Sequence, residues 1–156
     1  MSLKFAIFGT GNMARIYASL IRQNPHSELV GFVGNSSLTC KQIASEYSVS
    51  AFPNCEYNKF LDNTKVDAII VATPESIREE PIEAALQHQL HILIEKPVAD
   101  NWESVKRITS LLKNYSKVIA TCNVLRHSPR FNALFNAISE NQIGSIRHVT
   151  ARRNSN

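Results

Sequence analysis

The stretch from Lys4 to Ala14 combines residue types and spacing that suit phosphate binding. An apolar run short enough for a buried strand ends at Gly9, and a helix-like segment begins almost at once. Gly9 allows a sharp turn out of the strand, Gly11 leaves room for a pyrophosphate beside the backbone, and Ala14 lets the helix pack closely on the sheet. Unpaired N–H groups and the dipole at the helix start favour an anion there. The pattern predicts a dinucleotide-binding turn made of Gly9, Thr10, Gly11, Asn12, Met13 and Ala14.

A second group of reactive side chains follows a later apolar run. Residues 91–94 predict a buried strand, which delivers Glu95, Lys96 and Pro97 to the edge of the sheet. Two opposite charges at the end of a buried strand are costly unless they are paired or used. The lysine could therefore act in chemistry, or it could simply pair with the neighbouring glutamate.

The glycine turn alone does not establish nucleotide binding, because similar turns also occur in sheets that bind no nucleotide. The order of the predicted strands and helices has to agree with it. Strand and helix patterns alternate along the chain, and this predicts a doubly wound parallel α/β sheet of about six strands with helices on both faces. Ile16, Leu20 and Ile21 lie at helical spacing after the turn. The expected strands cover residues 4–8, 29–33, 50–52, 66–72, 91–94 and 118–123, and the expected helices residues 12–24, 38–47, 57–61, 79–89, 101–115 and 131–138.

The chain end predicts the beginning of another domain. Residues 146–151 alternate like a strand, and Gly144 is expected to cap the preceding helix. A complete fold rarely ends on a strand that has no partner. We therefore assign residues 1–123 to a cofactor-binding domain, and residues 124–156 to a connecting helix and the first strand of a truncated second domain.

The end of the second predicted strand bears on the choice of cofactor. In an NAD-preferring domain a carboxylate here accepts hydrogen bonds from the adenosine ribose, and no acidic residue lies between Val30 and Cys40. Gly34 occupies the expected position, and Asn35 and Ser36 could donate to a 2′-phosphate. The sequence thus slightly favours NADP over NAD, although these residues suit an ordinary turn and helix N-cap equally well.

Length and composition exclude several classes of protein. The chain has 156 residues, of which 44% are hydrophobic and 19% charged, so we expect a globular fold that needs no metal or disulfide. Its three cysteines form no CxxC pair, and neither a disulfide framework nor a zinc site is indicated. No apolar run approaches the roughly 20 residues of a membrane span, and no signal-type segment opens the chain. We expect a cytoplasmic protein without a membrane partner.

The net charge of +4 is confined to the end of the chain. Residues 1–125 carry 12 basic and 12 acidic side chains, whereas residues 126–156 carry five arginines and one glutamate. The aromatic residues in this stretch, Phe131 and Phe135, do not alternate with the arginines as a base-stacking surface requires. We therefore expect no nucleic-acid partner.

The glycine turn and the Glu95-Lys96-Pro97 strand end together resemble the glucose-fructose oxidoreductase, inositol dehydrogenase and MocA (Gfo/Idh/MocA) family. Thr73-Pro74, Asn123 and residues 126–129 also match, so the resemblance covers essentially the whole chain. It implies a Rossmann domain that binds NAD or NADP, followed by an α/β domain with substrate and oligomer contacts. It further implies an oxidoreductase that transfers a hydride to or from a sugar, inositol or related hydroxy or carbonyl compound, and that is a homo-oligomer when full length.

The same resemblance implies roles for individual residues. Thr73 and Pro74 fall on the loop on the nicotinamide side, and Glu95 on the contact to the cofactor ribose. Lys96 falls on the catalytic lysine, which donates to the substrate oxygen as the hydride moves. Pro97 could aim that side chain through a cis peptide bond. Asn123 falls among the cofactor contacts.

Three departures from the family pattern are visible. The acid of the second strand is absent, and Arg78 stands where a histidine is common. The family's general base, an acid and a histidine in the second domain, has no counterpart in these residues. We therefore expect this chain alone to be inactive. The alternative is a non-catalytic dinucleotide-binding sensor or scaffold, which would need no cation such as Lys96 beside the nicotinamide.

Overall fold

The computed structural model describes residues 2–152, and the chain divides into two compact units, Met1–Cys122 and Asn123–Asn156. Met1 and residues 153–156, which belong to the predicted domain ranges, lie outside the described residues. The first unit holds the sheet and both of the reactive stretches that the sequence indicates.

The first unit is built on a six-stranded sheet in which every strand pair is parallel. The strand order is β3-β2-β1-β4-β5-β6, so the direction of winding reverses between the two central strands. This confirms the predicted fold class. The strands are β1 (Leu3–Phe8), β2 (Ser27–Val33), β3 (Ser50–Phe52), β4 (Ala68–Val71), β5 (His91–Ile94) and β6 (Ile119–Thr121).

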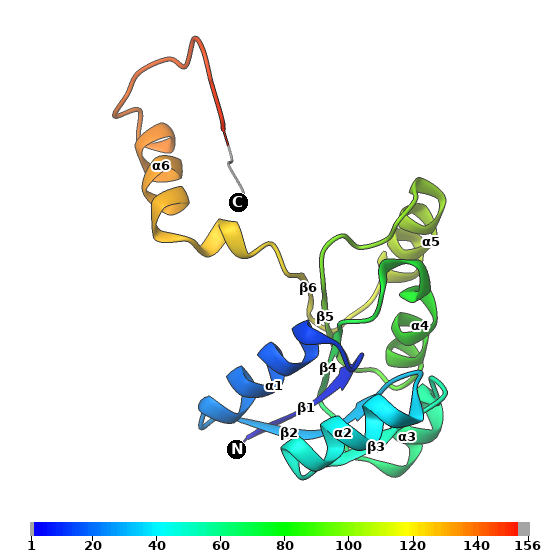
Figure 1. The fold of residues 1–156 in the computed structure, drawn as a ribbon. Coiled ribbons are helices and arrows are strands. Elements are labelled where there is room, and N and C mark those ends of the chain that lie inside the picture. Colours follow the sequence, from blue (N-terminus) through cyan, green and yellow to red (C-terminus); the bar gives the residue numbers. More distant parts are fainter. Residues whose placement is uncertain (1, 153–156) are drawn as a thin grey trace. The chain divides into compact units, whose positions relative to one another are not determined.

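Helices cover both faces of this sheet (Figure 1). Alternate residues of β1 point to opposite sides: Ile7 packs with side chains of α1 and α2, whereas Ala6 and Phe8 pack with those of α3, α4 and α5. The continuous apolar run of β4 is explained by this two-sided burial. The helices are α1 (Asn12–Gln23), α2 (Ser37–Tyr47), α3 (Tyr57–Asn63), α4 (Glu79–Gln87) and α5 (Trp102–Leu112), with a short 3₁₀ helix η1 (Glu75–Ile77).

The contact face of α1 differs from the one that large apolar residues suggest. Ala14, Tyr17 and Ala18 are buried together with Ile21, while Ile16 and Leu20 are half exposed. The two alanines allow the helix backbone to approach the sheet closely directly after the glycine turn. Small side chains thus decide which face of α1 is buried.

The second unit consists of a 3₁₀ helix, η2 (Val124–His127), and α6 (Pro129–Ser139). Pro129 occupies the first turn of α6, where its fixed φ suits a helix start. The prediction that Gly144 caps this helix is wrong, because the helix already ends at Ser139 and Glu140 is its C-cap residue. None of the helices in residues 2–152 has the length and apolar character needed to cross a membrane.

The strand expected at residues 146–151 is not formed, and this prediction is also wrong. An alternating sequence becomes a strand only when a neighbouring strand takes up its backbone hydrogen bonds. The part of the second unit that the structure describes contains helices and turns but no such neighbour.

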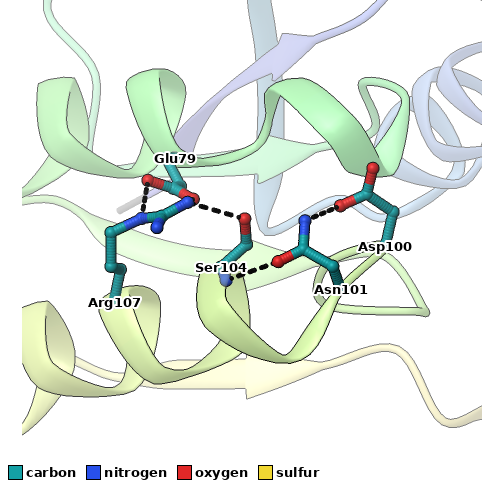
Figure 2. A network of polar contacts seen from close by, with 5 residues as sticks. All are labelled: Glu79, Asp100, Asn101, Ser104 and Arg107. Atoms are coloured by element: carbon teal, nitrogen blue, oxygen red, sulfur yellow. Dashed lines mark hydrogen bonds and ion pairs between the residues drawn. The ribbon is translucent and has the colours of Figure 1, made fainter.

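Polar contacts fasten the start of α4 to α5 on the surface of the first unit (Figure 2). Two guanidinium nitrogens of Arg107 each donate to a carboxylate oxygen of Glu79 at 2.8 Å, and one also donates to Ser104 Oγ at 2.9 Å. Asn101 caps α5 by accepting from the Ser104 N–H at 2.9 Å. The start of α5 is therefore capped by an asparagine, and the start of α4 is held by a two-bond pair between a carboxylate and a guanidinium.

Replacing Arg107 with Met should lower the melting temperature near neutral pH, and the difference from the wild type should shrink in acid. Hydrogen bonds from Arg107 and Ser104 hold the pKa of Glu79 at about 2, below its ordinary value of 4.5. A carboxylate with a depressed folded-state pKa stabilises the fold above its unfolded-state pKa, and this contribution is lost as the pH falls through the folded-state value. The relevant window thus lies between pH 4.5 and about 2.

Thermal melts across this window, down to the lowest pH at which both proteins are folded, test the expectation. Lys106→Met is the matched control, because it removes a charge from the same helix and leaves the Glu79 pair intact. The effect is small for a surface pair. A difference that stays constant with pH would contradict the assignment.

Candidate functional site

The glycine turn joins β1 to α1 through a backbone path that only glycine follows at its first position. Gly9 has a φ of +126°, and its N–H donates to the Val33 carbonyl at 2.7 Å. A β carbon at this position would lie 2.5 Å from the Ala72 carbonyl oxygen, which is closer than atoms can approach. The end of β1 therefore passes between its neighbours β2 and β4 in direct backbone contact.

The next glycine of the turn has open space beside it. Gly11 is the N-cap residue of α1, and a β carbon there would meet no atom within 4 Å. Within residues 2–152, no side chain caps the first N–H groups of this helix. Asn12 and Met13 begin the helix and are exposed, whereas Ala14 is fully buried. An uncapped helix start facing open space can receive an anion.

At the end of β2, Gly34 lies directly against the glycine turn. Gly34 is buried, and a β carbon there would lie 2.6 Å from Thr10 Cγ2 and 3.1 Å from Cys40 Sγ. Ser36 is the N-cap residue of α2, and its hydroxyl accepts from the Thr39 N–H at 3.5 Å, while Asn35 is exposed. The structure thus shows the turn and cap roles of these residues, and their contact with a 2′-phosphate stays a prediction.

The loop after β4 contains a buried polar atom without a partner. Thr73 is 5% exposed, and its Oγ1 has no hydrogen-bond partner among the described residues. Pro74 follows as the exposed residue before η1. Buried hydroxyl groups are nearly always hydrogen-bonded, so an orphan at the carboxyl edge of the sheet suits a ligand contact.

The carboxylate at the end of β5 is buried and engaged at both oxygens. Glu95 is 4% exposed; its Oε1 accepts from the Tyr17 hydroxyl at 2.5 Å, and its Oε2 from the Lys96 N–H at 2.9 Å. Burial raises the pKa of Tyr17, and its hydrogen bonds with Cys122 and Glu95 raise it further. The tyrosine hydroxyl therefore stays protonated and donates, which connects α1 to the end of β5.

The charge of the neighbouring lysine is not paired with Glu95. Lys96 is exposed, and its ammonium has no ion-pair partner among residues 2–152. The bond between Lys96 and Pro97 is cis, which confirms the expectation from the sequence. The lysine and Glu95 are thus linked through the backbone N–H rather than through their charges.

Sequence patterns did not indicate that Arg78 would contact this edge. Its side chain is 4% exposed, and it donates from Nε and Nη2 to the Thr73 carbonyl at 3.1 and 3.0 Å and from Nη1 to the Glu95 carbonyl. Burial lowers the pKa of this guanidinium, while Glu75 and Glu95 oppose that shift. The only sequence signal was its departure from the histidine common in the family.

The structure places most of the predicted site residues at one edge of the first unit. The glycine turn, Gly34, Thr73 and Glu95 all lie at the carboxyl ends of parallel strands, on both sides of the reversal between β1 and β4. Such an edge is where open α/β sheets bind ligands. The open space at Gly11 and the orphaned Thr73 hydroxyl fit a dinucleotide. Asn123 begins the second unit, where its carbonyl accepts from the Arg126 N–H at 3.0 Å.

No metal site is evident at this edge or elsewhere in the described chain. Among residues 2–152, no three histidine, cysteine, aspartate or glutamate side chains gather closely enough to hold a metal ion.

Comparison with known proteins gives a family match over the sheet-forming unit. A family model described as "Oxidoreductase family, NAD-binding Rossmann fold" matches residues 3–122. An inositol 2-dehydrogenase of Arthrobacter sp. is 26% identical over 146 residues, which are 93% of this chain and 43% of that relative. The chain thus spans less than half the length of such relatives.

Solved structures share the fold. A scyllo-inositol dehydrogenase of Lactobacillus casei, determined with bound NAD(H) and scyllo-inositol, superposes with a TM-score of 0.83 at 18% identity, over 92% of this chain and 43% of that one. A biliverdin reductase of Synechocystis sp., determined with biliverdin and NADP⁺, gives a TM-score of 0.72 at 23% identity, over 88% of this chain and 43% of that one.

Replacing Gly9 with Ala should destabilise the chain by about 2 kcal/mol or more, since the methyl group would overlap the Ala72 carbonyl at a strained φ. Gly11→Ala is the matched control, because its methyl group enters open space at a φ of −82° and should cost less than about 1 kcal/mol. Urea unfolding curves measure both values. Equal costs at the two positions would show that the close contact at Gly9 does not constrain the turn.

Proposed function

Because this chain belongs to the Gfo/Idh/MocA oxidoreductase family and carries its NAD-binding Rossmann domain, we propose that it is the cofactor-binding part of an NAD(P)-dependent oxidoreductase. The uncapped start of α1 beside Gly11, at the reversal of the strand order, carries this proposal. The bound dinucleotide would supply the hydride acceptor or donor.

Different residues of the carboxyl edge would then bind different parts of the cofactor. The turn from Gly9 to Ala14 holds the pyrophosphate, because the uncapped helix start beside Gly11 can receive an anion. Thr73 and Pro74 lie on the nicotinamide side, where the orphaned threonine hydroxyl gains a partner. Glu95 keeps its bonds to Tyr17 and to the backbone, and its remaining lone pairs accept from the cofactor ribose.

Lys96 is the residue to which we assign a catalytic role. An exposed ammonium without an ion pair can donate to a substrate oxygen and stabilise the negative charge that develops as the hydride moves. Its cis peptide bond to Pro97 and the bond from its N–H to Glu95 orient the backbone that carries it. This availability favours a dehydrogenase over a non-catalytic sensor or scaffold, which has no use for a cation here.

We infer a slight preference for NADP. The end of β2 lacks a carboxylate that would repel a 2′-phosphate. The exposed Asn35 precedes the cap residue Ser36, and the exposed Lys41 lies one turn into α2. Solved proteins of the same fold carry either NAD(H) or NADP⁺. An acid at Gly34 would collide with Thr10, so this chain could not gain an NAD-type carboxylate there without rearranging the turn.

The complete protein would act on a sugar, inositol or related hydroxy or carbonyl compound, since relatives include inositol 2-dehydrogenases. In this proposal Asn123 contributes a cofactor contact, and residues 124–156 lead into a second domain that supplies the substrate contacts and the general base. Homo-oligomer formation and a cytoplasmic location stay predictions.

Gly11→Val should weaken NADP and NAD binding at least several-fold while the chain remains folded. The valine side chain would occupy the open space that the pyrophosphate needs, and its β carbon would meet no atom of the free protein within 4 Å. Calorimetric titration of both proteins with both dinucleotides measures this, and a thermal melt checks the fold. Equal affinity in wild type and variant would refute the phosphate cradle, and a tenfold preference of the wild type for NAD would refute the inferred NADP preference.

Lys96→Ala in the full-length protein should lower kcat much more than it weakens cofactor binding, because the ammonium acts mainly as charge develops on the substrate oxygen. Steady-state kinetics beside a cofactor titration separate the two effects. The 156-residue chain alone should show no turnover. Unchanged kcat in the variant, or dehydrogenase activity from the short chain, would contradict the assignment.

A further inference from the structure

Arg78 connects the segments that follow β4 and β5, just beyond the last backbone hydrogen bond between these two strands. The last backbone bond between β4 and β5 runs from the Glu95 N–H to the Val71 carbonyl at 3.0 Å. Both strands end here and continue as loops, the first beginning at Ala72 and containing Thr73, the second beginning at Glu95. The guanidinium of Arg78 donates to the carbonyls of both residues. It therefore bridges the two loops where the sheet no longer does.

A purely stabilising role explains this arrangement poorly. The side chain is 4% exposed, and within residues 2–152 no carboxylate forms an ion pair with it. Removing a guanidinium from water costs free energy that the hydrogen bonds to carbonyls and the charges of Glu75 and Glu95, neither of which forms an ion pair with it, offset only in part. The guanidinium does fix the position of the Thr73 carbonyl relative to the Glu95 carbonyl, because its planar group of donors bonds to both at once.

We propose that Arg78 is a positioning residue that sets the spacing between the Thr73-Pro74 loop and the Glu95-Lys96-Pro97 loop, and thereby shapes the pocket for the nicotinamide end of the cofactor. This inference rests on the proposed function. In that function the adenosine and pyrophosphate end would lie at the glycine turn and at the end of β2, whereas the hydrogen bonds of the Arg78 side chain go to the Thr73 and Glu95 carbonyls. Loss of Arg78 should therefore affect one end of the dinucleotide and spare the other.

The chain offers a matched control on the same helix start. Arg78 is the N-cap residue of α4, and Glu79, the first residue of that helix, is paired on the outer surface with Arg107. Arg107→Met loosens the start of α4 from outside and leaves the Thr73 and Glu95 carbonyls untouched. A general loosening of the helix can thus be distinguished from loss of the bridge between the loops.

The test compares a whole dinucleotide with a fragment that lacks the nicotinamide ribose. The 156-residue chain is titrated calorimetrically with NADP and 2′,5′-ADP, or with NAD and ADP, whichever dinucleotide the wild type binds more tightly. Arg78→Met should reduce dinucleotide affinity about tenfold and fragment affinity less than about twofold. Arg107→Met should change both by less than about twofold. Arg78→Lys, which keeps a charge but not the fork, should also lower the ratio of the two affinities.

Each outcome decides between support and refutation. A lowered ratio of dinucleotide to fragment affinity in a folded Arg78 variant, with an unchanged ratio in Arg107→Met, supports the proposal. An unchanged ratio in folded Arg78 variants overturns it, as does an equal fall in Arg107→Met. Unfolding of both Arg78 variants would assign the residue to stability and overturn it too. Failure of the wild type to bind either dinucleotide would instead refute the proposed function, on which the inference rests.

Discussion

The backbone contact between the end of β1 and the end of β4 is the constraint on which the site depends. Gly9 bonds to Val33 on one side and lies against the Ala72 carbonyl on the other, so the chain must leave the sheet along a path that a β carbon would block. That path starts α1 at once and brings Ala14 against the sheet. The uncapped N–H groups of the helix therefore face the edge at the reversal of the strand order, where parallel sheets bind ligands.

Buried polar groups at this edge are satisfied by one another, with one exception. Tyr17 donates to Glu95, Glu95 accepts from its own neighbouring N–H, and Arg78 donates to two carbonyls. Each of these groups would be costly to bury alone, and together they hold the loops after β4 and β5 in one arrangement. The Thr73 hydroxyl is the group left over, and Lys96 is the charge left in solvent. The network thus provides a rigid frame and leaves a donor and a cation for a ligand.

The two errors at the chain end have a common cause. Residues 146–151 have the alternating pattern of a strand, and Gly144 has the residue type of a helix cap. A strand depends on hydrogen bonds from another segment, and a cap depends on where the last turn of the helix falls. The helix ends at Ser139 with Glu140 as its C-cap residue, and the described part of the second unit supplies no neighbouring strand. Local pattern alone was insufficient in both cases.

The sequence by itself determined the alternating fold, the glycine turn and the positions of Glu95 and Lys96, because periodicity, glycine sterics and strand ends are properties of short segments. Only the tertiary structure decided which groups meet. Tyr17 and Glu95 are 78 residues apart in sequence yet share a hydrogen bond. Arg78 is part of the site because it donates to backbone carbonyls, which every residue type has and which a sequence pattern therefore cannot reveal. Likewise, Gly34 is required by contact with Thr10 and not by its own turn. Contacts between distant segments depend on packing in three dimensions, which no local pattern encodes.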